Sequence, residues 1–405
     1  MLRFAIHFLL LIACSRVLAA DHWVDAWAAV PDSTDDPAPA QTVRQIVRPS
    51  IGGRAVQIHL SNLYGDAPLV LQSVHIARHG VGSAIVMGSD HRLTFGGKSK
   101  VTLAKGEEVW SDPVSMKVSP GGELAVSFYL PNPVHAPTIH GVAMATGYAL
   151  PGKDAAAALR LDSAKTFDTR LLLTGLRVGT PLQEHVLVVL GDSISDGVGS
   201  APDRNLRWPD QLASRLQATG RVDVAVIAAG IAGNRILRPG SDPFVGPSAL
   251  ERLDRDALDR SGVRWVLLLE GINDIAASDI VKQPEQAASA EEIIHGMQTL
   301  IARAHARQVK VIGATLLPLG GANFPPYTEA GEAKRQAVNQ WIRTAGEFDS
   351  VIDLDAVLRD PAQPNRLLPA YDSGDHCHPN DAGHKAMADA VDLLVLRDQA
   401  KMTMR

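Results

Sequence analysis

Three side chains that are far apart in the sequence have the types that acyl-transfer chemistry needs: a serine, a histidine and an aspartate. Ser193 lies in the run Gly-Asp-Ser-Ile-Ser at 191–195, directly after an apolar segment. A serine at a strand-to-helix turn exposes its hydroxyl at a sheet edge, where the helix N-terminus favours a developing negative charge. The run alone is more typical of a helix cap than of a nucleophile, and it is not the Gly-x-Ser-x-Gly pattern of a nucleophile elbow.

Asp375 and His378 lie near the C-terminus in the run Asp-His-Cys-His-Pro. Their spacing lets the carboxylate meet the imidazole across one turn, fix its tautomer and stabilise its charged form. Two alternatives remain open: surface residues near a helix start, and a local metal site. The sequence has no distant ligand pattern such as His-Glu-x-x-His, which argues against a metal. The ligands of such a site would be Asp372, Asp375, His376, Cys377 and His378.

Two further residues could stabilise an oxyanion. Gly233 follows a second apolar segment, and a glycine permits close approach of the backbone to a ligand. Asn273 follows a third apolar segment, where its amide could point over the sheet edge. Each residue alone is typical of a turn. Together with Ser193, Asp375 and His378, each following its own segment, they predict one site.

The second part of the chain, residues 184–405, is predicted to alternate strands and helices. Such a pattern is typical of a three-layer fold, a parallel sheet with helices on both faces and an active site at the carboxyl ends of its strands. The predicted strands are 185–190, 222–228, 264–269, 310–316 and 351–354. The predicted helices are 208–218, 249–260, 290–307, 329–345 and 381–396.

The first part of the mature chain, residues 21–183, is predicted to be a β-sandwich of jelly-roll type. Apolar and polar residues alternate along 56–60, 114–118 and 124–130, and glycine pairs punctuate these runs. A chain of 405 residues is long for a single core, which also favours two domains.

The motifs of the second part resemble those of the SGNH hydrolase superfamily, also called GDSL esterases and lipases, over residues 184–396. The resemblance implies that Ser193 is the nucleophile, His378 the general base and Asp375 its partner. It further implies an oxyanion hole made of the Ser193 N–H, the Gly233 N–H and the Asn273 side chain.

Other positions agree with the resemblance less specifically. Asp192 matches the acidic residue before the nucleophile, and Trp208-Pro209 matches a common helix start. Ala228 departs from the pattern, because many members carry Asn there, and we expect this to alter the anchoring of the next loop. The β region, with Thr-Val-Arg-Gln at 42–45 and Leu-Ser-Asn at 60–62, resembles the accessory domain of a bacterial subgroup.

The N-terminus predicts export. A positive end, an apolar stretch over residues 4–13 and small residues at 17–20 are typical of a signal peptide covering residues 1–20. A lipoprotein signal with lipidation at Cys14, or a buried N-terminal element, are the alternatives. Cleavage after residue 20 leaves Cys377 alone, so no internal disulfide is expected. No later segment has the length and composition of a membrane span.

Taken together, these features predict an exported serine carboxylester hydrolase that forms an acyl-enzyme and needs no metal or organic cofactor. The net charge of −5 and the scattered Lys and Arg give no electrostatic footprint for nucleic acid. An aromatic content of 5% and the lack of a long apolar lid favour short acyl groups such as acetyl, including those of polysaccharides.

Three other functions stay open: a lipase or phospholipase, an O-acyltransferase, and a binding protein with a vestigial hydrolase domain. The sequence leaves the oligomeric state open. Arg235 or Arg238 could face the substrate. The candidates for stacking against a sugar, each more typical of a core residue, are Trp27, Tyr64, Trp110 and Tyr129.

Overall fold

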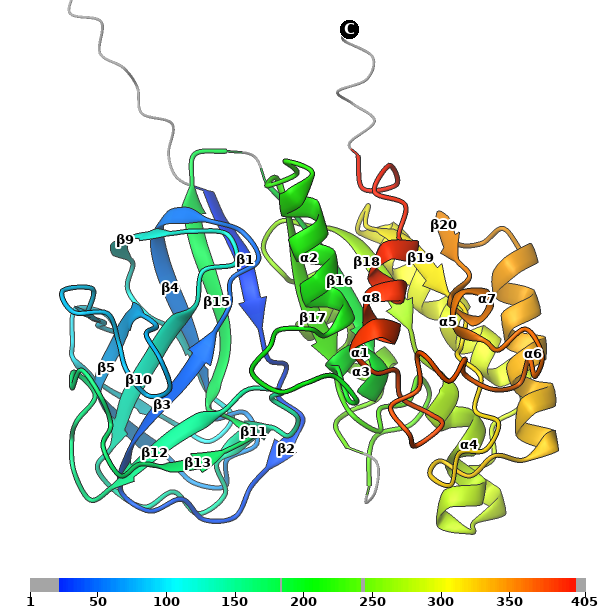
Figure 1. Ribbon diagram of the computed structural model, residues 1–405. Helices are drawn as coiled ribbons and strands as arrows, with labels where there is room; N and C mark the ends of the chain where they lie inside the picture. Colours follow the sequence, from blue (N-terminus) through cyan, green and yellow to red (C-terminus); the bar gives the residue numbers. More distant parts are fainter. Residues whose placement is uncertain (1–21, 183, 242–244, 398–405) are drawn as a thin grey trace, which may run out of the picture.

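The computed structural model describes residues 22–182, 184–241 and 245–397 (Figure 1). The predicted signal peptide and Cys14 lie outside these residues. The described chain has a β-rich half followed by an α/β half, as the sequence predicts. The predicted boundary between 183 and 184 stays a prediction.

Two antiparallel sheets make up most of the β half and confirm the predicted sandwich. One sheet has the order β1 (His22–Ala28), β15 (Leu173–Thr180), β4 (Gly53–Ser61) and β8 (Glu108–Trp110), with β9 (Val114–Val118) also paired to β4. The other has the order β13 (Lys165–Phe167), β12 (Gly147–Pro151), β3 (Gln41–Val47), β10 (Leu124–Leu130), β5 (Leu69–Arg78) and β6 (His91–Arg92), with β7 (Lys100–Leu103) paired to β5.

A third, small sheet lies on the side of the sandwich that faces the α/β half (Figure 1). It consists of β14 (Arg170–Leu171), β11 (Thr138–His140) and β2 (Ser33–Thr34). The three alternating runs of the sequence fall within β4, β9 and β10. In β4 the apolar positions Val56, Ile58 and Leu60 are fully buried, which is the reason for the alternation.

The α/β half has a parallel sheet in the order β17 (Val224–Gly230), β16 (His185–Gly191), β18 (Val263–Leu269), β19 (Lys310–Ala314) and β20 (Ser350–Ile352). The chain order therefore reverses at β16, and the carboxyl end of β16 is the expected place for a ligand crevice. Residues 186–190 of β16 are all fully buried, as in a strand covered on both faces.

Helices cover both faces of this sheet (Figure 1). On one face α2 (Trp208–Ala218) packs against α8 (Asp381–Ala390), and α7 (Leu354–Leu358) contacts α8. The other face carries α3 (Ala249–Leu253), α5 (Ala290–Ala306) and α6 (Glu329–Thr344). Two helices follow strands at the carboxyl edge: α1 (Ser193–Asp196) and α4 (Ile272–Val281).

The predicted helices are confirmed with changes at their ends. The segment 249–260 is divided, because a π-helix over Asp254–Leu258 continues from α3. The last predicted helix ends at Ala390 and not at 396. The helix α4 was not predicted, since its run Ile-Asn-Asp-Ile-Ala-Ala has no clear polar face. Its start depends on Gly271, whose φ of 124° is costly for other residues.

The two halves share one hydrophobic core in the described part of the chain, to which strands of both sandwich sheets and of the parallel sheet contribute. Strand β1 packs beside β17, the edge strand of the parallel sheet. The hydroxyl of Ser50 donates to Ala26 O at 3.0 Å and accepts from the Val226 N–H at 3.0 Å. The β half is therefore bonded directly to the sheet that carries the predicted site.

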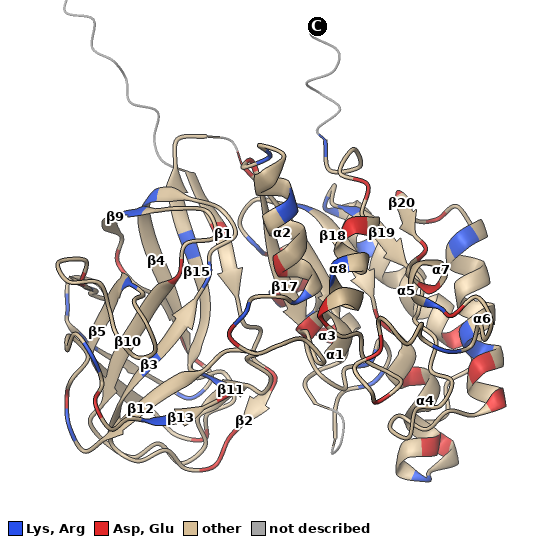
Figure 2. Cartoon of the chain, viewed as in Figure 1, with Lys and Arg blue, Asp and Glu red and all other residues tan. Residues whose placement is uncertain are grey.

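Positive and negative side chains are interspersed over both halves (Figure 2), as their distribution in the sequence suggests. Among the described residues, no helix has both the length and the apolar character needed to cross a membrane.

Candidate active site

Ser193, His378 and Asp375 lie in one hydrogen-bonded row. The Ser193 Oγ is 2.8 Å from His378 Nε2, and His378 Nδ1 is 2.6 Å from Asp375 Oδ2. Ser193 begins α1 directly after β16, and the other two residues lie in the loop before α8. The structure thus brings together the three residues that the sequence proposes, in the order that lets a histidine take a serine proton. Their catalytic roles stay predictions.

The Asp375 carboxylate is held in its ionised form by its neighbours. Its Oδ1 accepts backbone N–H bonds from Cys377 at 2.9 Å and His378 at 2.8 Å. Burial raises the pKa of Asp375, but the His378 ring and these two N–H groups outweigh burial and hold the pKa well below its usual range. A carboxylate that stays charged can orient His378 and stabilise its protonated form.

The same loop holds a second aspartate–histidine pair. Asp372 Oδ2 is 2.5 Å from His376 Nδ1, and the His376 side chain is 48% exposed. The backbone of His376 is left-handed, with a φ of 64°, and its ring is paired with Asp372 and not with Ser193. Cys377 is buried, and burial raises the pKa of its thiol well above the usual value. Among the described residues, no group of three or more His, Cys, Asp or Glu is arranged to hold a metal ion.

The turn before Ser193 depends on two close approaches. The Asp192 carboxylate caps α1 by accepting from the Ile194 N–H at 3.0 Å, and its burial raises its pKa to about 6. A Cβ on Gly191 would lie 2.4 Å from Leu269 O, and a Cβ on Gly230 would lie 2.3 Å from the Asp196 N. Glycine at these two strand ends lets α1 settle on the sheet edge with Ser193 partly exposed.

The loop that carries Gly233 lies next to this turn, because the Ile231 N–H donates to Gly191 O at 3.0 Å. Gly233 has a φ of 75°, which favours glycine. The Asn273 Nδ2 donates to Asn234 O at 2.9 Å, which leaves its second N–H for a ligand. Gly233 and Asn273 are therefore held by the same stretch of backbone, beside Ser193.

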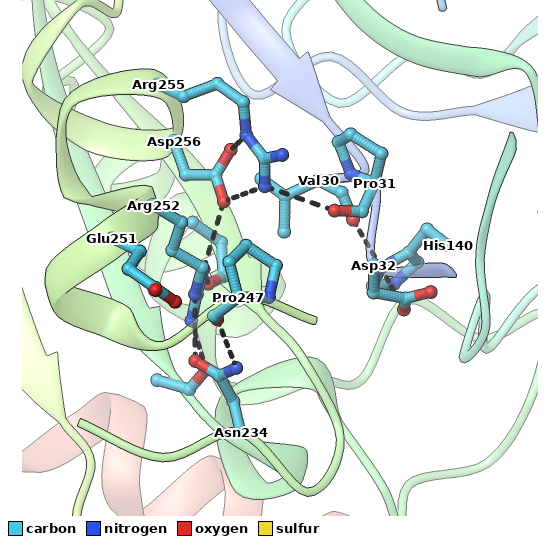
Figure 3. Close-up of polar contacts among 12 residues, drawn as sticks. Val30, Pro31, Asp32, His140, Asn234, Pro247, Glu251, Arg252, Arg255 and Asp256 are labelled. Carbon is cyan, nitrogen blue, oxygen red and sulfur yellow. Dashed lines mark hydrogen bonds and ion pairs between the residues drawn. The ribbon is translucent and has the colours of Figure 1, made fainter. Parts of the chain in front are cut away.

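The anchor of this loop was not identified from the sequence. The Asn234 side chain donates to Pro247 O at 2.9 Å and accepts from Arg252 Nε at 2.8 Å (Figure 3). The Arg252 guanidinium also donates to Ala229 O at 2.8 Å and to Gly191 O at 3.0 Å. The anchoring of the loop thus depends on the side chains of Asn234 and Arg252. Ala228 lies in β17, and its methyl side chain has no polar group with which to hold the loop. Arg252 gave no sequence signal beyond its place in an amphipathic helix.

Two more buried acids lie beneath the site. Asp274 accepts from the N–H groups of Ile236 at 2.8 Å and Leu237 at 3.0 Å, and burial raises its pKa to about 6. Glu270 lies 3.7 Å from Arg252, and burial together with the charge of Asp192 raises its pKa well above the usual value. Asp274 therefore fixes the chain that follows the Gly233 loop.

The other residues singled out in the sequence lie elsewhere. Arg235 donates to Gln286 and Pro239 O, and Arg238 donates to Glu285 O, so both hold loops together. In the β half, Trp27 and Trp110 each lie under an arginine, and the Tyr64 hydroxyl accepts from Arg255. Tyr129 is a half-buried residue of β10.

Comparison with known proteins supports the resemblance seen in the sequence. Residues 189–386 match the model of the GDSL-like Lipase/Acylhydrolase family. The chain is similar to a GDSL-like lipase from Bacteroides thetaiotaomicron VPI-5482, with 18% identity and a TM-score of 0.39 over 52% of this chain and 87% of that one.

Two further solved structures are similar at the same level. One is a variant of an acetyl xylan esterase from Geobacillus stearothermophilus, with 23% identity and a TM-score of 0.38 over 52% of this chain and 94% of that one. The other is an alpha/beta hydrolase enzyme from the metagenome of Lake Arreo, Spain, with 21% identity and a TM-score of 0.39 over 51% and 92%. No curated protein matches the chain.

The two aspartate–histidine pairs allow a matched test of the row. We expect Asp375→Asn to lower kcat for p-nitrophenyl acetate by roughly 10⁴-fold, because an amide at this position favours the wrong tautomer of His378. Asp372→Asn, in the same loop, should leave kcat close to that of the wild type. Equal losses in the two variants would contradict the assignment and point to a general disturbance of the loop.

Proposed function

The α/β half of this chain belongs to the GDSL-like lipase/acylhydrolase family and is a carboxylic ester hydrolase, and we propose that it works through an acyl-enzyme on Ser193. The observation that carries this proposal is the hydrogen-bonded row from Ser193 Oγ through His378 to Asp375 Oδ2. This row offers a nucleophile, a base next to it and a carboxylate that orients the base.

The proposed reaction has two steps. His378 Nε2 accepts the proton of Ser193 Oγ as the oxygen attacks the ester carbonyl, and Asp375 stabilises the resulting imidazolium. The negative oxygen of the tetrahedral intermediate would receive hydrogen bonds from the N–H groups of Ser193 and Gly233 and from Asn273 Nδ2. His378 then protonates the departing alcohol. A water activated by the same histidine releases the acid and restores Ser193.

We further propose that the substrates carry short acyl groups, acetyl above all, and that polysaccharide esters are among them. The low aromatic content of 5% and the lack of a long apolar lid segment in the sequence support this choice. The composition of residues 1–20 supports export by a cleaved leader. The N-terminus of the mature protein would show whether the chain starts at residue 20 or 21 or at a lipidated Cys14.

Substitution of the nucleophile tests the mechanism. We expect Ser193→Ala to lower kcat for p-nitrophenyl acetate by roughly 10⁶-fold, because no other group in the row can form the acyl-enzyme. A fluorophosphonate should label the wild type at Ser193 and leave the variant unlabelled. Full activity in a purified, folded Ser193→Ala protein would overturn the proposed function.

The acyl group is tested with a series of p-nitrophenyl esters from acetate to palmitate, together with acetylated xylan, xyloglucan and pectin. We expect kcat/KM to be highest for acetate and to fall as the chain lengthens. A maximum at long chains would instead identify a lipase. Transfer of the acetyl group to an added sugar, in place of acetate release, would identify an acyltransferase.

A further inference from the structure

His140 of the β half is buried against the turn that carries Ser193. Its Nδ1 lies 2.9 Å from Val30 O and its Nε2 lies 2.8 Å from Val142 O. A backbone carbonyl can only accept, so each ring nitrogen must donate a proton to satisfy these contacts. The geometry therefore requires the doubly protonated, positively charged form of the ring.

Two carboxylates balance this buried charge. Asp196 Oδ1 lies 3.0 Å from Nε2 and Asp32 Oδ2 lies 3.4 Å from Nδ1. The His140 side chain is 4% exposed and those of both acids are 2% exposed. Burial and the charge of Arg207 lower the pKa of His140, but the two carboxylates outweigh them and raise it to about 9. Such a charge is stable in a protein interior only while its partners stay in place.

Asp196 connects His140 to the predicted oxyanion hole. It is the last residue of α1, the helix that begins at Ser193. Its second oxygen, Oδ2, accepts from the backbone N–H of Ala232 at 3.2 Å. Ala232 immediately precedes Gly233. A contact that holds the Ala232 N–H therefore also limits the direction of the Gly233 N–H. A shift of the Asp196 carboxylate would rotate a donor that must point at the reacting oxygen.

A second route joins the same two regions (Figure 3). Arg255 donates to Pro31 O at 3.1 Å and to Asp256 Oδ1 at 2.6 Å. Asp256 lies 3.4 Å from Arg252, which in turn donates to Asn234 Oδ1. Both routes start within residues 30–32 of the β half and end within residues 232–234 of the loop.

We propose that His140 is a positioning residue of the active site, which sets the Gly233 N–H through the Asp196 carboxylate and so makes the β half part of the oxyanion hole. The proposal rests on the proposed function, since it assigns a partner to the same site. The β half then acts as a fixed support for the reacting centre and not as a separable attachment.

Substitution of His140 by glutamine removes the positive charge and keeps a polar side chain. We expect His140→Gln to lower kcat for p-nitrophenyl acetate by roughly tenfold to hundredfold with little change in KM, because ground-state binding does not use the oxyanion donors. His140→Gln/Asp196→Asn should recover part of the lost kcat, since it removes the carboxylate left without its cation. His75→Gln is the matched control, because His75 is also buried and paired with a carboxylate, Asp90.

An unchanged kcat in folded His140→Gln would overturn the inference. So would equal losses in His140→Gln and His75→Gln. Where His140→Gln does not fold, Asp32→Asn carries the test, because it weakens the charge balance while both ring hydrogen bonds remain; a lower kcat at constant KM supports the proposal and an unchanged kcat refutes it. Ser193→Ala distinguishes failure of this inference from failure of the proposed function, because activity retained in Ser193→Ala refutes the proposed function itself.

A different observation concerns a cavity of about 250 Å³ between the two halves. Arg170 lines this cavity and is only 6% exposed. Its Nη1 donates to Ile46 O at 2.7 Å, and its guanidinium lies 5.3 Å from the centre of the Trp27 ring. In the part of the chain that the structure describes, no carboxylate lies within ion-pair distance of Arg170.

The acids that line the same cavity are already satisfied. Asp203 accepts from the Thr146 N–H and from its hydroxyl, both at 2.6 Å. Glu123 accepts from Asn205 at 2.9 Å and from His79 at 2.7 Å. Three arginines also line the cavity: Arg207 is paired with Asp210 at 2.7 Å, Arg48 is half-buried, and Arg170 is the buried one that has no ion-pair partner among the described residues.

We infer that this cavity binds a monocarboxylate through Arg170. A planar guanidinium matches a carboxylate in a two-pronged hydrogen bond, and a bound anion would balance a charge that burial otherwise destabilises. The carboxylate could belong to an acidic sugar residue, whose ring the Tyr148 side chain would flank, or to a free short acid.

Binding is measured by calorimetry with galacturonate, acetate, galactose and phosphate. We expect a carboxylate to bind and galactose not to bind. Binding of galacturonate but not acetate would identify the ligand as an acidic sugar. Binding of both would show that the site accepts a carboxylate from either source. Arg170→Gln should weaken binding by about tenfold to hundredfold. Arg177→Gln is the matched control, because Arg177 lies over Trp110 outside the cavity. This variant should bind carboxylates as tightly as the wild type does.

Should Arg170→Gln fail to fold, Ala145→Leu replaces it, because Ala145 lines the cavity and a larger side chain would fill the space. Loss of binding in that variant supports the site. Binding of phosphate in preference to carboxylates, or no binding of any carboxylate to the wild type, would overturn the inference.

Discussion

One buried guanidinium, that of Arg252, holds the strand ends on which the candidate site is built. It donates to Gly191 O at the end of β16, to Ala229 O near the end of β17 and to the Asn234 side chain. Arg252 is only 1% exposed, and an ion in such a position would be strongly destabilising without partners. Because its donors are spread over two strands and a loop, movement of any one of them would leave part of a buried charge unsatisfied. This constraint fixes the distance between the Ser193 turn and the Gly233 loop.

Buried carboxylates complete this arrangement from below. Asp192 caps α1 by accepting from the Ile194 N–H, and Asp274 accepts from the N–H groups of Ile236 and Leu237. Their burial raises both pKa values to about 6, so these bonds are strongest in neutral solution, where the acids are ionised. The segments next to the predicted oxyanion donors are thus held by hydrogen bonds that need no substrate. Such preorganisation is what lets hydrogen bonds act on the transition state without the cost of rearrangement.

The sequence predicted the parts of this site that follow local rules. Ser193, Gly233 and Asn273 each come after an apolar run, and parallel strands bring their carboxyl ends to one edge. Asp375 and His378 are three residues apart, so their contact could be foreseen. Arg252 and His140 could not, because their partners lie on other elements and no local spacing marks them. The helix α4 was missed for a similar reason: it is buried at the sheet edge, and its apolar character reflects its surroundings.

The role of the β half follows from how its aromatic and charged residues are used. Trp27 and Trp110 lie beneath Arg170 and Arg177, so neither ring face is free in the way that a sugar platform requires. What the half offers to the catalytic side is a short segment, residues 30–32, from which two polar routes lead to the Gly233 loop. Both routes include charged groups, and both would be cut by separating the halves, which would leave Asp196 without His140 and the Arg255 guanidinium without Pro31 O. The shared core makes such a separation still more unfavourable. The β half is therefore best understood as the part of the fold against which the catalytic edge is held.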